Sequence, residues 1–228
     1  NPIDTKYETM NFFVPEAYFK GESVNGYNNY DAPIFFPNQV GGYMPAEAGS
    51  PGTSRDGVNP NAIFVALSKG YVVASPGARG RVTKNANGLY TGKAPAAIVD
   101  LKAAVRYLHY NDKVMPGSAN RIVSNGTSAG GALSSLLGAS GNNKDYDKYL
   151  KEIGAANASD AVLVVSAYCP ITNLENADMA YEWLFNGINE YKSLKITQST
   201  DFKVERTYVT GSMTEDQIKA SNELKAMF

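Results

Sequence analysis

Residues 122–137 read IVSNGTSAGGALSSLL, and this stretch decides the fold. The apolar run Ile122 to Asn125 predicts a strand, and the small-residue run Ala129 to Leu137 predicts a helix. Between them stands GTSAGG, residues 126–131, in which a serine lies two residues from a glycine on either side. A strand that passes directly into a helix through such a segment needs a turn too sharp for side chains beside the serine.

Ser128 is therefore the candidate nucleophile. The turn would hold its hydroxyl above the carboxyl edge of a sheet, at a helix N-terminus where the helix dipole favours developing negative charge. The N–H of Ala129 would be one donor of an oxyanion hole. The alternative is a small-residue turn that only packs a helix against a strand.

A second oxyanion donor is expected from the loop that follows an earlier strand. Gly41 and Gly42 follow the apolar run that ends at Phe36, in the chain order that this requires. Either glycine would let the backbone approach a substrate closely, and we favour Gly42. The alternative is a simple turn.

Strand and helix signals alternate along the first three quarters of the chain. This alternation predicts βαβ units and a mostly parallel sheet flanked by helices, which together with the serine turn is typical of the α/β-hydrolase fold. The last strand is apolar enough to be buried on both faces. The predicted strands are Met10 to Val14, Ala32 to Phe36, Tyr71 to Ala74, Ile122 to Asn125 and Ala161 to Ala167; the predicted helices are Asn61 to Ser68, Pro95 to Tyr110 and Ala129 to Leu137.

The pattern changes after Pro170. Two helical stretches, Asn176 to Phe185 and Met213 to Phe228, follow without a strand signal of comparable strength. Ser212 and Glu215 have the spacing of a capping box for the second of them. We therefore expect residues 1–172 to form the N-terminal part of a hydrolase core and residues 173–228 to begin a helical cap, with the chain incomplete at both ends.

Composition narrows the range of partners. The formal net charge is −1 and no run of basic residues occurs, so nucleic acid is not an expected partner. No apolar stretch approaches the length of a membrane span, and no dinucleotide or phosphate-loop pattern or metal-ligand spacing is present. Cys169, the single cysteine, allows no disulfide within the chain and is expected to be a packing residue. A lone cysteine fits the cytoplasm and a secreted bacterial enzyme equally.

A base for Ser128 is missing from the sequence. His109, the only histidine, precedes the serine on a helix, whereas the α/β-hydrolase order is serine, acid, histidine. We expect His109 to be a solvated surface residue, and Glu175 and Asp178 to be cap or surface residues. A serine hydroxyl without a base is a poor nucleophile, so either other polypeptide supplies the acid and histidine or the chain is inactive alone.

Several segments together resemble the bacterial tannases and related feruloyl esterases, most closely the lactobacillal type of tannase. NGTSAGG at 125–131, YCPI at 168–171 and ADMAYEW at 177–183 are more specific than the serine pentapeptide alone, and further resembling stretches run from residue 11 to residue 189. The resemblance implies hydrolysis of galloyl or similar phenolic esters without a cofactor. It also implies that Ser128 is the nucleophile, that Gly42 gives the second oxyanion N–H, and that Ile171 lines the acyl pocket.

In that family the catalytic aspartate and histidine come from the C-terminal half, so the resemblance implies a complementary C-terminal segment or chain as a partner. Three other functions stay open. They are an esterase of the same fold for feruloyl, acetyl-sugar or short-chain acyl groups, a serine peptidase of that fold, and a non-catalytic binding protein.

Overall fold

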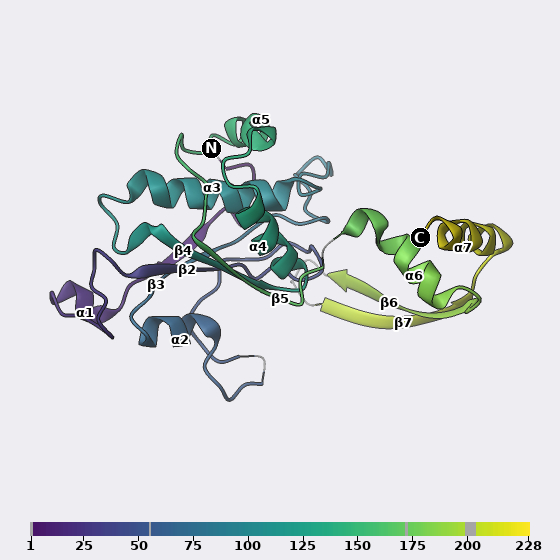
Figure 1. Ribbon diagram of the computed structural model, residues 1–228, viewed down its shortest axis with the longest axis horizontal. Coiled ribbons are helices and arrows are strands. Elements are labelled where there is room, and N and C mark those ends of the chain that lie inside the picture. The colour runs from purple at the N-terminus through teal and green to yellow at the C-terminus, as the bar shows by residue number, and fades with distance from the viewer. Residues whose placement is uncertain (1, 55, 172, 199–203) are drawn as a thin grey trace. The chain divides into compact units, whose positions relative to one another are not determined.

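The computed structural model describes residues 2–54, 56–171, 173–198 and 204–228 (Figure 1). The chain divides into two compact units, Asn1–Ile171 and Thr172–Phe228. This division falls one residue before the boundary expected from the sequence. Among the described residues, no helix has the length and hydropathy needed to cross a membrane.

A five-stranded sheet organises the first unit. Its strands follow the order β1 (Met10–Phe13), β3 (Val72–Pro76), β2 (Pro33–Pro37), β4 (Ser118–Thr127) and β5 (Val164–Tyr168). Only β1 is antiparallel to its neighbour, and the pairs β3–β2, β2–β4 and β4–β5 are all parallel. The prediction of a mostly parallel sheet is confirmed. The parallel strands bring the residues after β2 and β4 to one edge of the sheet.

Helices cover both faces of this sheet. In Figure 1, α3 (Ala96–Asn111) and α4 (Ala129–Ala139) lie on one face and α2 (Ala62–Ser68) lies on the other. The stripe Ile98, Leu101, Val105 and Leu108 on α3 is buried in the main core, as its helical spacing predicts. Two short helices, α1 (Glu16–Phe19) and α5 (Asp147–Glu152), were not predicted from the sequence.

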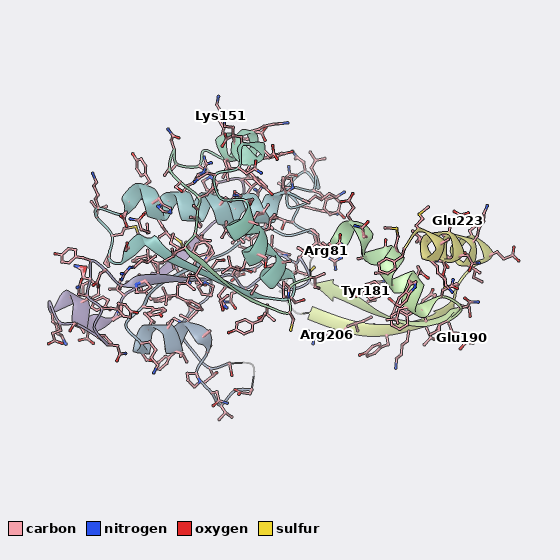
Figure 2. All side chains as sticks on the ribbon, viewed as in Figure 1. Arg81, Lys151, Tyr181, Glu190, Arg206 and Glu223 are labelled. Carbon is pink, nitrogen blue, oxygen red and sulfur yellow. The ribbon has the colours of Figure 1, made fainter. Side chains whose placement is uncertain are left out.

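The second unit holds two helices and a hairpin. Helices α6 (Ala177–Phe185) and α7 (Glu215–Met227) match the two predicted helical stretches, but the antiparallel strands β6 (Glu190–Gln198) and β7 (Val204–Ser212) were not predicted. Figure 2 shows Tyr181 on α6 and Glu190 at the start of β6. The identification of this unit as a cap stays a prediction.

The capping box of α7 lies two residues later than predicted. Ser212 ends β7, and Thr214 is the N-cap instead. The Thr214 hydroxyl accepts from the Gln217 N–H at 3.3 Å, and the Gln217 side chain accepts from the Thr214 N–H at 2.9 Å. The pattern T-x-x-Q satisfies the same backbone donors as S-x-x-E, and the strand takes the earlier serine.

The prediction that strand β5 is buried on both faces is wrong. The strand stands at one end of the sheet order; its first residue, Val164, is 45% exposed, and Leu163 just before it is 64% exposed. Cys169, which follows it, is exposed and is not a packing residue. The apolar composition of this strand is that of a central strand, whereas only β4 pairs with it among the described residues.

A buried ion pair fixes α3 to the segment before β5. Lys102 Nζ lies 2.9 Å from Asp160 Oδ1, and both side chains are fully buried. Asp160 also accepts from Arg106 Nε at 2.8 Å and from the Asn142 N–H at 2.7 Å. Burial alone raises the pKa of Asp160, but these donors lower it by more, so the net pKa lies below its usual value.

Acid should therefore weaken the first unit through Asp160. A carboxyl whose pKa is lower in the folded state stabilises that state above its unfolded pKa, and the stabilisation is lost as the pH falls through the folded value. We expect urea unfolding to show a free energy that falls below a pH of about 4. The fall should be shallower in Asp160→Asn than in the exposed control Asp145→Asn. Equal slopes in the two variants would contradict this role.

Candidate active site

The serine turn has the geometry that its sequence predicts. Ser128 lies between β4 and α4, where it is the N-cap residue with φ 59° and ψ −120°, a conformation that is strained for a residue with a side chain. Its N–H donates to the Tyr168 carbonyl at 2.9 Å, and its own carbonyl accepts from the Ala132 N–H at 3.0 Å. The hydroxyl makes no capping bond, which leaves it available to a substrate or a base.

Two glycines around the serine have no room for a side chain. A Cβ on Gly126 would lie 2.2 Å from the Gly130 carbonyl oxygen, and one on Gly131 would lie 2.7 Å from the Tyr168 carbonyl oxygen. Both obstacles are backbone atoms, which cannot rotate away. The close packing of β4, α4 and the end of β5 therefore depends on glycine at these positions.

The loop that carries Gly42 makes a tight turn. The Met44 N–H donates to the Gly41 carbonyl at 3.0 Å, and the two residues between them, Gly42 and Tyr43, have φ values of 57° and 56°. Positive φ at both central positions is the pattern of a type I′ turn. Gly42 is exposed, and a Cβ built on it would meet no atom within 4 Å. Glycine is needed here for its backbone conformation and not for lack of space.

The segment after β3 braces this loop. The Arg81 N–H donates to the Tyr43 carbonyl at 2.8 Å, while the Arg81 side chain is exposed (Figure 2). A Cβ on Gly80 would lie 2.1 Å from the Pro45 nitrogen, so the two backbones are in contact. Arg79 anchors the segment, because its Nη2 and Nε lie 2.7 and 3.0 Å from the buried Asp100 carboxylate. Sequence reasoning missed this brace, since the arginines carried no motif.

The structure brings Ser128, Ala129 and Ile171 together. Ala129 is the buried first residue of α4, and the Ile171 N–H lies 3.5 Å from the Ser128 carbonyl oxygen. The loop of Gly42 also approaches α4, since a Cβ on Gly130 would lie 2.7 Å from the Val40 carbonyl oxygen. The roles of Gly42, Ala129 and Ile171 in binding remain predictions.

The prediction that His109 is a solvated surface residue is wrong. The residue is half-buried, and its Nε2 lies 3.0 Å from the Ala161 carbonyl oxygen, so it links α3 to the segment before β5. Ser128 follows Thr127, which pairs with Tyr168 at the other end of β5. At about 3.3 Å per residue the two ends of β5 are at least roughly 13 Å apart. His109 therefore cannot be the base for Ser128.

Glu175 and Asp178, which are expected to be cap or surface residues, lie in the second unit. Glu175 belongs to a short 3₁₀ helix, and Asp178 lies in the first turn of α6. In the parts of the chain that the structure describes, no group of three or more His, Cys, Asp and Glu residues could hold a metal ion.

A cavity of about 890 Å³ lies elsewhere in the first unit. Its lining comes mainly from β1, α3 and residues 153–157 and includes neither Ser128 nor Gly42. Ser128 itself is half-exposed. The cavity is therefore separate from the candidate active site.

The chain is similar to known proteins in sequence and in fold. A family model described as BD-FAE matches residues 49–211. A Fusobacterium nucleatum tannase of known crystal structure is 60% identical in sequence to this chain, with a TM-score of 0.90. The match covers all of this chain and 49% of the tannase chain. A tannin acyl hydrolase from Lactobacillus plantarum is 48% identical, with a TM-score of 0.87 and the same two coverages.

A tannin acyl hydrolase solved in complex with ethyl gallate is 49% identical, with a TM-score of 0.84; all of this chain aligns with 47% of it. The chain thus spans about half the length of the solved structures that it matches. Among curated proteins, none matches the chain.

Proposed function

Because this chain belongs to the BD-FAE family, which its sequence matches over residues 49–211, we propose that it carries the nucleophile of a serine esterase for phenolic esters. The observation that carries the proposal is the strained backbone of Ser128 at the junction of β4 and α4, together with a hydroxyl that makes no capping hydrogen bond to α4. Strain at one residue, held by a tightly packed turn, is typical of a residue positioned for chemistry.

The proposed reaction is acyl transfer through Ser128. Ser128 Oγ attacks the ester carbonyl while a histidine accepts its proton, and the Ala129 and Gly42 N–H groups stabilise the oxyanion. The alcohol leaves with a proton from the histidine. Water, activated by the same histidine, then hydrolyses the acyl-enzyme and frees the acid.

We propose that further polypeptide supplies the histidine and the acid, either as a C-terminal segment or as a second chain. His109 lies at the wrong end of β5, and the solved tannases are about twice as long as this chain. The edge of β5 supports the same idea, because an exposed apolar edge strand is a surface to which another strand adds. We call the chain together with this polypeptide the completed protein.

The proposed substrates are galloyl esters. The support is the level of identity to tannases, one of which was solved with ethyl gallate, and the position of Ile171 beside the Ser128 backbone, where it would contact the acyl ring. Feruloyl esters are the second candidate, and the family match favours them.

Hydrolysis rates of two methyl esters test this proposal. The completed protein should hydrolyse methyl gallate with a kcat/KM at least about tenfold above that for methyl ferulate, since a site with partners for ring hydroxyls rejects an acyl group that lacks them. The isolated chain should hydrolyse neither ester. A preference for ferulate would transfer the assignment to feruloyl esters, and hydrolysis of neither ester by the completed protein would reject both.

A further inference from the structure

Asn38 is a buried amide whose hydrogen-bonding groups are all occupied. It follows the last residue of β2 and is 6% exposed. Its Nδ2 lies 3.0 Å from the Gly130 carbonyl oxygen, 3.0 Å from Ser134 Oγ and 3.1 Å from the Asn125 carbonyl oxygen. Its Oδ1 accepts from the Val40 N–H at 3.3 Å.

These bonds join the two sides of the proposed oxyanion hole. Gly130 lies in the first turn of α4, next to Ala129, and Val40 lies two residues before Gly42. The Asn38 N–H also donates to the Asn125 carbonyl at 2.9 Å, which fixes its backbone to β4. The Asn38 side chain thus links the loop that carries Gly42, the helix that begins at Ala129, and the strand that leads to Ser128.

The glycines of the serine turn leave space for this amide. A Cβ on Gly130 would lie 2.6 Å from Asn38 Oδ1, and a Cβ on Gly126 would lie 2.6 Å from Asn38 Nδ2. The amide therefore occupies the volume that both residues leave empty. The packing also requires its chemistry, since aspartate has no N–H to donate and glutamine is longer by a methylene group.

We propose that Asn38 is a positioning residue that sets the separation of the Gly42 and Ala129 N–H groups. It does not touch the substrate. Oxyanion stabilisation requires donors within hydrogen-bond distance of an oxygen that exists only during reaction, so a shift of one wall of the hole slows the chemical step. Substrate binding in the ground state depends on other contacts and should change little. The inference rests on the proposed function of Ser128.

The experiment compares Asn38→Ala and the near-isosteric Asn38→Asp with Gln39→Ala, all in the completed protein. We expect kcat on methyl gallate to fall roughly 10- to 100-fold in both Asn38 variants, with KM changed less than about threefold. Phenylboronic acid, which forms a tetrahedral adduct with an active serine, should bind more weakly in proportion to kcat/KM, while inhibition by gallate should be retained. Gln39→Ala should leave kcat, KM, boronate affinity and inhibition by gallate unchanged.

Values of kcat and boronate affinity within threefold of wild type in folded Asn38 variants would overturn the inference while the function of Ser128 stands. A proportional rise of KM and loss of gallate inhibition would also overturn it, since that would indicate a general collapse of the site. If Asn38→Ala does not fold, the kcat and boronate affinity of Asn38→Asp test the inference instead. Wild-type protein without hydrolysis or boronate binding would instead reject the proposed function itself.

Discussion

Replacing Ser128 by alanine is expected to abolish the burst of alcohol release from an activated phenolic ester such as p-nitrophenyl gallate. The burst reports formation of the acyl-enzyme, and no acyl-enzyme forms without the serine oxygen. Steady-state hydrolysis by the completed protein should fall by at least roughly three orders of magnitude, as removal of a nucleophile does in serine hydrolases. Stopped-flow absorbance at the wavelength of p-nitrophenolate measures both quantities.

Ser135→Ala is the matched control, because Ser135 lies in the same helix as the residues that follow Ser128. It should retain the burst. The fold should survive the Ser128 change, since Ser128 is half-exposed and its hydroxyl makes no capping bond. A Ser128→Ala protein that is folded and still gives a burst would show that another residue is acylated.

Gly126→Ala should strongly destabilise the first unit. Its methyl group would lie 2.2 Å from the Gly130 carbonyl oxygen and 2.4 Å from the Gly130 carbonyl carbon, so β4 and α4 would have to separate. We expect a loss of about 3 kcal/mol or more in the free energy of unfolding, and loss of esterase activity in whatever protein remains folded. Urea unfolding followed by circular dichroism measures the first quantity.

Gly52→Ala provides the comparison for that measurement. Gly52 is exposed, and an added Cβ would come no closer than 3.8 Å to Asn61 Nδ2, so its stability should change by less than about 1 kcal/mol. Equal stabilities for the two variants would mean that the turn can open, and the explanation for glycine at position 126 would be wrong.

Most of the first unit could be predicted from sequence, because its signals are local. Strand β4, the turn at Ser128 and helix α4 follow from one segment, in which apolar residues give way to glycines and then to small residues. The stripe on α3 has a helical period that only a helix can bury on one side. Where neighbouring residues carry the information, the sequence was sufficient.

The features that were missed depend on residues far apart in the chain. Asn38 meets Gly130 and Ser134 across more than ninety positions, and no local pattern marks an asparagine as a link between a strand end and a helix. One signal was present: a polar residue at the end of a buried strand, three residues before a pair of glycines. Parallel topology would have placed it beside the serine turn.

The hairpin of the second unit was not predicted from the sequence for a different reason. Residues 190–198 read EYKSLKITQ, in which charged and polar residues interrupt the apolar positions, so neither period dominates. Pairing with β7 decides the conformation, and pairing is not visible in one strand alone. The predictions for β5 and Cys169 were wrong in the opposite way. Their apolar composition indicated burial, whereas they are exposed among the described residues.

Mapping a covalent label tests the assignment of the nucleophile most directly. The completed protein is incubated with a fluorophosphonate, digested and analysed by tandem mass spectrometry. We predict one modified residue, Ser128, with labelling blocked by prior incubation with methyl gallate and absent from the isolated chain. A protein that hydrolyses methyl gallate while its label lies on another residue, or on none, would contradict the assignment.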